Sequence, residues 1–203
     1  MLPEADVTLP SLPSLPIGGP TAPAPAETPP SRPATPPPAD PADQAGFDGW
    51  KDGFLRRHGG ARRAEYEREL AGLTPDPSVI RLDRNQPEFS RPVGAYLANA
   101  VNATRIAESR RRLTDVPWEV PQRFGVPAEI LVAIWANESG FGRIQGDYDV
   151  IRSLATLAFD GRRRDWAETQ LKDALDIVVD GRRERSGLKG SWAGAMGQTQ
   201  FMP

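Results

Sequence analysis

The chain has 203 residues, no cysteine and a formal net charge of −2, with 38% apolar and 26% charged residues. These values describe a globular protein of one or two domains, and they exclude the large basic excess of a nucleic-acid-binding protein. Without cysteine there is no disulfide, thiolate nucleophile, cysteine-ligated zinc or lipid-anchoring cysteine, so the compartment must be inferred from other features.

The N-terminal residues 1–46 differ in composition from the rest of the chain. They hold 14 of the 22 prolines and no aromatic residue. Such a segment cannot bury a core, which predicts a disordered, polyproline-like tail or linker. It contains no basic stretch followed by an apolar core, so no signal peptide is visible. A spacer is the simplest interpretation, although PxxP sequences also suit aromatic grooves and leave docking to a cell-wall protein partner open.

The ordered region is expected to begin at FDGWKDGFLRRH, where Phe47, Trp50 and Phe54 recur at helical spacing and share one face. TPDPS and NQPEFSRP supply breaks between later helices, and no convincing alternating strand follows. The longest apolar run, ILVAIWA, is too short to span a membrane. Residues 47–203 therefore predict a single, mainly α domain. The lone histidine, His58, is expected at the surface, with no metal site around it.

A helix is predicted over ATRIAESRRRL, with Asn102 as its N-cap. Pro117 and Pro121 lie beyond it and should end or interrupt that helix, because proline lacks the backbone N–H and clashes with the preceding turn.

Glu138 stands in GVPAEILVAIWANESGFG, after an apolar run and before two glycines. Pro127 suits a helix start and Gly140 a helix end, and the run between them is apolar on every side, which predicts a buried helix. Its last turn would present Glu138 at the floor of a cleft. Partial desolvation and the helix dipole would then raise the pKa of the carboxyl, as glycosidic-bond cleavage by acid catalysis requires. A solvated glutamate at a helix end is the alternative.

The segment NESGFGRIQGDYDVIRSLATLAFDGRRR, followed by LKGSWAGAMGQTQFMP, resembles the lytic murein transglycosylase B family. The resemblance runs from about Phe47 to Pro203 and includes TPDPSVIRLDRNQPEFSRPVGAYL. It implies a lysozyme-like helical catalytic domain that cleaves the β-1,4 bond between N-acetylmuramic acid and N-acetylglucosamine. The product would carry a 1,6-anhydromuramoyl end, and no cofactor is implied.

The same resemblance assigns roles to individual residues. Glu138 matches the catalytic acid, which then acts as base toward the C6 hydroxyl. Ser191 matches a serine that orients the N-acetyl group, Gln200 a glutamine that contacts the sugar, and Tyr96 an active-site tyrosine. The basic pair thought to meet the peptide stem is matched by two arginines, Arg163 and Arg164. A solvated arginine face is the alternative for that pair.

A second catalytic carboxylate is not evident. Asp147 and Asp149 are nearest to Glu138 in sequence, but GDYDV suits loop capping or solvation better. A lytic enzyme needs no such partner, because the N-acetyl group of the substrate can stabilise the oxocarbenium-like state. The glycines and aromatic residues of GSWAGAMGQTQFMP allow close backbone approach and stacking on a sugar, or equally a tight helix contact.

Three functions remain open on the sequence. The first is a periplasmic lytic transglycosylase acting on peptidoglycan glycan strands. The second is a non-catalytic peptidoglycan-binding or scaffold protein, since the family pattern continues past QFMP and this chain is expected to be truncated at its C-terminus. The third is a muramidase that admits water. The three differ in products: anhydromuramic ends, none, and reducing ends.

Overall fold

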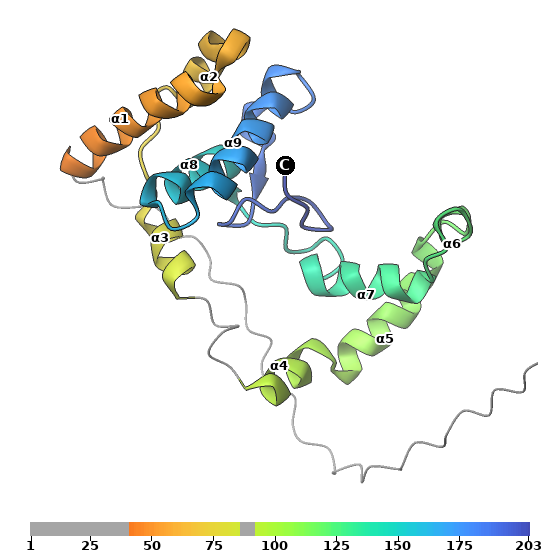
Figure 1. Cartoon of the computed structure of the whole chain (residues 1–203). Helices are drawn as coiled ribbons and strands as arrows, with labels where there is room; N and C mark the ends of the chain where they lie inside the picture. Colours follow the sequence, from red (N-terminus) through yellow and green to blue (C-terminus); the bar gives the residue numbers. More distant parts are fainter. Residues whose placement is uncertain (1–40, 86–91) are drawn as a thin grey trace, which may run out of the picture. The chain divides into compact units, whose positions relative to one another are not determined.

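Helices make up most of the described structure, as the apolar spacing and turn signals predict. The structure, a computed structural model, describes residues 41–85 and 92–203 (Figure 1). Its helices in this part are α1 (Pro41–His58), α2 (Arg63–Leu70), α3 (Pro77–Arg84), α4 (Val93–Ala100), α5 (Ala103–Arg112), α6 (Glu119–Phe124), α7 (Ala128–Ser139), α8 (Val150–Asp160) and α9 (Arg164–Val179). Two short strands, β1 (Tyr148–Asp149) and β2 (Lys189–Gly190), pair antiparallel.

Helix α8 lies at the centre of the larger hydrophobic core. Asp149 caps it by accepting a hydrogen bond from the Arg152 backbone N–H at 3.0 Å, which confirms the capping role predicted for this aspartate. The side chains of Ile151 and Leu154 are fully buried. Each buried side chain of this size contributes about 1.5–3 kcal/mol relative to leaving it exposed. Helix α9 packs along α8, and buried residues of α1, α2 and α3 complete the same core.

Helix α1 closes one side of this core. Its aromatic residues Phe47, Trp50 and Phe54 are buried, which confirms the predicted face. The helix begins at Pro41, before the first of these aromatics. The Trp50 indole N–H donates to the Glu168 carboxylate of α9 at 3.1 Å, so a hydrogen bond joins the two helices.

The expectation of a surface His58 is wrong in part. His58 is half-buried at the end of α1, where its ring lies 4.9 Å from the Phe54 ring and its Nε2 lies 2.9 Å from Glu168. Burial by itself would raise the pKa of the Glu168 carboxyl, but hydrogen bonds from Arg57, His58 and Trp50 outweigh it and lower that pKa. The histidine therefore belongs to a partly buried polar cluster around Glu168, between α1 and α9.

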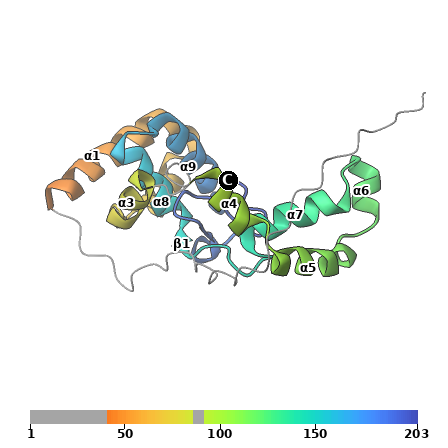
Figure 2. The same cartoon turned by 90° about the horizontal axis from the view of Figure 1, so that it is seen from below.

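A second, smaller core lies on α7, and α5 runs beside this helix (Figure 2). Val132, Ala136 and Phe141 are buried in it. Asn102 caps α5 as predicted, accepting from the Arg105 backbone N–H at 2.9 Å. Helix α5 ends at Arg112, ahead of Pro117, as predicted, and Pro121 lies within the separate short helix α6.

Two predicted segments, the proline-rich tail and the break at NQPEFSRP, lie mostly outside the described residues. Residues 1–40, most of the predicted proline-rich tail, and residues 86–91 of NQPEFSRP lie outside the described residues. In the part of the chain that is described, no helix is long and apolar enough to cross a membrane.

Candidate active site

Glu138 lies in the last turn of α7, and its side chain is exposed. Gly140 ends the helix in the left-handed conformation, with φ of 55°, as the sequence predicts. The prediction of a helix buried on all sides is wrong. Ile130 and Ile134 are 51% and 43% exposed, because the described elements pack against only one side of α7. The partial desolvation expected for the carboxylate is therefore not supplied by the described residues.

The turn after Glu138 has an unusual backbone. Phe141 has φ of 63° and Gly142 has φ of 82°, so a residue with a large side chain occupies a region that favours glycine. Packing compensates this strain, since Phe141 is buried and meets the Trp135 ring edge-on at 5.6 Å. Such strained positions persist only where the surroundings determine them, and they gather at functional sites.

Ser139, directly after Glu138, anchors this helix end to the C-terminal segment. Its hydroxyl donates to the Gln198 backbone carbonyl at 2.6 Å and accepts from the Gly142 N–H at 2.9 Å. The side chain is buried, and a Cβ added at Gly142 would lie 2.9 Å from the Gln198 side chain. The sequence reasoning missed Ser139, because its partner is 59 residues away along the chain.

The segment 188–203 folds into a compact set of turns beside β1. Strand β2 pairs with β1, and isolated bridges join Gly190 to Met196 and Met196 to Phe201. Gly146 has φ of 85°, and a Cβ there would overlap the Gly190 carbonyl. Glycine at these positions thus allows two backbone segments to touch, which confirms the close approach expected from the small residues of this stretch.

Ser191 and Gln200 both lie on this segment. The Ser191 hydroxyl accepts from the Ala195 N–H at 3.1 Å, which leaves its own proton available to donate. Gln200 has φ of 50°, and its amide nitrogen donates to the carbonyls of Gly197 at 2.8 Å and Gln145 at 3.2 Å. Both amide hydrogens are thereby used, so the side-chain oxygen is the atom that Gln200 can present to a ligand.

Tyr96 belongs to α4, but its side chain is outside the described set. The structure therefore brings three of the predicted site residues into one connected region. Glu138 lies on α7, and the hydrogen bond of Ser139 joins the end of this helix to the segment that carries Ser191 and Gln200. Asp147 is exposed in the intervening loop, and the other carboxylate considered, Asp149, is paired with Arg185 at 2.7 Å.

Arg163 is already engaged within the protein. Its guanidinium donates to the buried carboxylate of Asp83 at 2.6 Å and lies over the rings of Trp166, at 4.8 Å, and Trp192, at 5.8 Å. Trp192 follows Ser191, so this cluster borders the region described above. Arg164 donates from Nε to the Ala158 carbonyl at 3.2 Å and is otherwise exposed.

Asp83 was not anticipated from the sequence, although it organises this corner. Arg162 also binds it, through two hydrogen bonds of 2.6 and 2.7 Å. Burial alone would raise the pKa of the Asp83 carboxyl, but the hydrogen bonds and charges of Arg162 and Arg163 outweigh burial and hold that pKa below its ordinary value. In the described ranges 41–85 and 92–203, no cluster of histidine and acidic residues has the arrangement of a metal site.

Comparison with known proteins gives consistent matches. A family model described as "Transglycosylase SLT domain" matches residues 46–203. Membrane-bound lytic murein transglycosylase B of Escherichia coli (strain K12) is 32% identical over 168 residues, which cover 75% of this chain and 45% of that protein. The chain thus spans less than half of that curated relative.

Solved structures match as well. SltB3 from Pseudomonas aeruginosa is 46% identical with a TM-score of 0.69, over 77% of this chain and 43% of that one. It was solved in complex with NAG-NAM-pentapeptide and with NAG-anhNAM-pentapeptide. The Escherichia coli lytic transglycosylase Slt35, solved in complex with calcium, is 29% identical with a TM-score of 0.64, over 80% of this chain and 53% of that one.

Proposed function

Because this chain belongs to the transglycosylase SLT domain family, we propose that it is a lytic transglycosylase of peptidoglycan, with Glu138 as its catalytic acid and base. The observation that carries the proposal is the link from Ser139 to Gln198. It fixes the helix end bearing Glu138 to the segment bearing Ser191 and Gln200. The relative solved with NAG-anhNAM-pentapeptide supports the anhydro product class.

The proposed reaction uses one carboxyl group twice. Glu138 donates its proton to the oxygen that leaves with N-acetylglucosamine as the bond to C1 of N-acetylmuramic acid breaks. The C6 hydroxyl of the same muramic acid then forms the new bond to C1, and its proton passes to the Glu138 carboxylate. Water is not consumed, and the carboxyl group returns to its starting state. The exposed position of Glu138 fits this scheme if the glycan itself covers the side chain and excludes water on binding.

Ser191 and Gln200 act on the sugar in this proposal. The free proton of the Ser191 hydroxyl donates to the N-acetyl carbonyl, which orients that group to stabilise the oxocarbenium-like state. The side-chain oxygen of Gln200 accepts from a sugar hydroxyl or amide. Its left-handed backbone and two internal hydrogen bonds hold that oxygen in one place, which is the preorganisation that catalysis requires.

The two arginines have different proposed roles. Arg163 is paired with Asp83 and lies over the rings of Trp166 and Trp192, so it serves as a structural residue beside the site. Arg164 is exposed and keeps its terminal nitrogens for a carboxylate of the peptide stem. A periplasmic location follows from the substrate. Residues 1–46 are proposed as a spacer and as the docking segment for a cell-wall protein partner, and residues 47–203 as the catalytic domain.

The test compares the parent chain with Glu138→Gln and with Glu129→Gln, a matched control for an exposed glutamate in the first turn of the same helix. Each is incubated with purified peptidoglycan, and released muropeptides and sedimentation with the sacculus are both measured. The proposal expects release by the parent and by the control, and no release by Glu138→Gln despite retained binding. Binding without release by all three would instead support the non-catalytic scaffold.

A further inference from the structure

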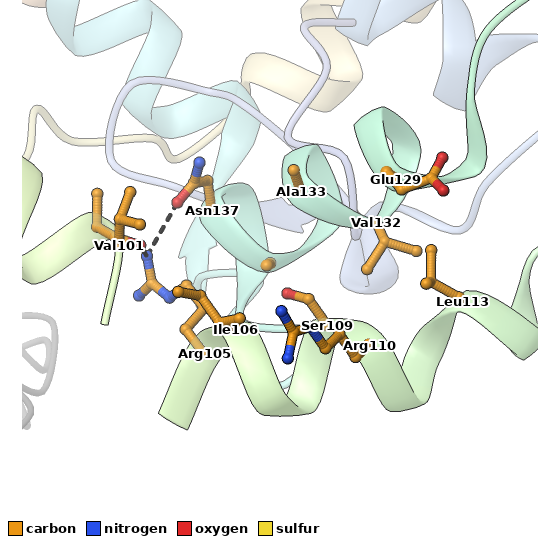
Figure 3. Close-up of a pocket in the computed structure, with 12 residues that line it drawn as sticks. Val101, Arg105, Ile106, Ser109, Arg110, Leu113, Glu129, Val132, Ala133 and Asn137 are labelled. Atoms are coloured by element: carbon orange, nitrogen blue, oxygen red, sulfur yellow. Dashed lines mark hydrogen bonds between the residues drawn. The ribbon is translucent and has the colours of Figure 1, made fainter. Parts of the chain in front are cut away.

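Arg105 of α5 joins two other helices through a single nitrogen. Its Nη1 donates to the Ala100 carbonyl, at the last residue of α4, at 3.0 Å. The same nitrogen donates to the side-chain oxygen of Asn137 at 2.9 Å (Figure 3). Asn137 immediately precedes Glu138 on α7. One guanidinium therefore connects α4, α5 and the catalytic turn of α7.

Apolar packing around this connection is incomplete. A pocket of about 280 Å³ lies between α5 and α7, and Arg105 and Asn137 line it together with apolar residues such as Val101 and Ile106. On α4 itself, Val93 is 73% exposed and Leu97 is 52% exposed. An open pocket provides fewer of the close contacts that fix one helix against another. The directional hydrogen bonds of Arg105 therefore carry more of the positioning here than they would in a packed core.

Helix α5 is well suited to act as the fixed reference. Glu108 binds Arg143 through two hydrogen bonds of 2.6 and 3.2 Å, which secures α5 to the turn after Glu138. One helical turn further on, Arg112 lies over the rings of Trp135 and Phe141 at 5.6 and 5.7 Å. The end of α5 is thus held to α7 by charge and cation–π contacts, whereas its beginning reaches α4 and α7 through Arg105.

We propose that Arg105 is a positioning residue for the lytic reaction: it fixes α4, which carries Tyr96, in register with the α7 turn that carries Glu138. The inference rests on the proposed function for its catalytic part. It assigns no contact with substrate to Arg105. Loss of the guanidinium would leave both helices folded and would loosen their relative placement, which lowers turnover because reacting groups tolerate little misplacement.

The test uses Arg105→Met, Arg105→Lys and Asn137→Ala, singly, together with the double variant Arg105→Met/Asn137→Ala. Arg110→Met is the matched control, because Arg110 is an exposed arginine of the same helix and lines the same pocket. The kcat and KM for release of anhydromuropeptides, the amide hydrogen exchange of α4 and the thermal unfolding midpoint are measured for each variant.

Arg105→Met is expected to lower kcat by about tenfold or more, the effect of removing a hydrogen bond from a charged group, with KM within about twofold. Exchange at the end of α4 should accelerate, including the Val101 N–H that donates to Leu97. Exchange in α8 and the unfolding midpoint should match the Arg110→Met control. Arg105→Lys should recover part of kcat, and the double variant should be no slower than Arg105→Met, because both changes break the same connection.

Two results would overturn the inference. One is a kcat and an α4 exchange rate for Arg105→Met equal to those of the control. The other is a loss of activity that accompanies a matching loss of stability and faster exchange throughout α8, which would make Arg105 a general structural residue. An inactive parent chain would refute the proposed function separately. In that case the amide hydrogen exchange of α4 in Arg105→Met, compared with Arg110→Met, still tests whether Arg105 holds α4 in place.

Discussion

Ser139→Ala should weaken both the fold and the reaction, because it cuts the link between the helix end of Glu138 and the C-terminal segment. The two shorter hydrogen bonds of its hydroxyl, of 2.6 and 2.9 Å, are lost together with a long one of 3.4 Å to the Trp135 carbonyl. Ser139 is buried, but the backbone groups that it binds belong to Gly142 and Gln198, which are not buried, so water can replace part of each bond. A loss of about 1 kcal/mol per bond is therefore appropriate, or roughly 2 kcal/mol in total.

For a chain of this size, such a change lowers the thermal unfolding midpoint by roughly 4–8 °C. Turnover should fall further than stability explains, by about tenfold at a temperature where the variant is fully folded, because Glu138 and Gln200 lose their fixed relative position. Differential scanning calorimetry and the rate of muropeptide release check the two parts. Ser153→Ala is the control, since Ser153 is also buried but belongs to α8. Equal midpoints and rates for the two alanine variants would mean that the Ser139 hydroxyl does not secure the helix end to the C-terminal segment.

Three further predictions concern the surroundings of the site. Gly146→Ala should lose more than about 3 kcal/mol of stability and unfold at a lower temperature, because a Cβ there overlaps the backbone of β2. Gly187→Ala, where a Cβ meets open space, is the calorimetric control and should change little. Asp83 has a pKa lowered on folding, so its stabilisation is complete above the ordinary value of 3.8 and disappears as pH falls below it. The free energy of unfolding should therefore fall less steeply with decreasing pH in Asp83→Asn than in the parent chain. An equal pH dependence in the two would contradict the ion pairs of Asp83. Ser191→Ala should slow muropeptide release less than Glu138→Gln does, because one orienting hydrogen bond is lost and not the acid; equal losses would give Ser191 a different role.

Local features of the fold were predictable from the sequence. The helical spacing of Phe47, Trp50 and Phe54 predicted a buried face of α1, and Asn102 and Gly140 marked helix ends where the structure has them. Each of these depends on residues within a few positions of one another, where backbone geometry is decided by capping, proline and glycine.

Long-range partners could not be predicted in the same way. His58 was expected at the surface, because its partner Glu168 lies 110 residues away and nothing in RRHGG indicates it. The bonds of Ser139 and Arg105 likewise depend on how distant segments meet. The apolar run of α7 predicted burial on every side, but the described elements cover only one side of this helix. Apolar residues can be buried without having to be, so composition alone does not decide how much of a helix is covered.

In the proposed reaction Glu138 transfers protons within the substrate, and water takes no part in bond cleavage. The most direct measurement is mass spectrometry of muropeptides released by the parent chain in water labelled with heavy oxygen. We expect products one water lighter than hydrolysis products, without the label, and no such products from Glu138→Gln. Reducing ends that carry the heavy oxygen would contradict the proposed reaction and would identify a hydrolytic muramidase.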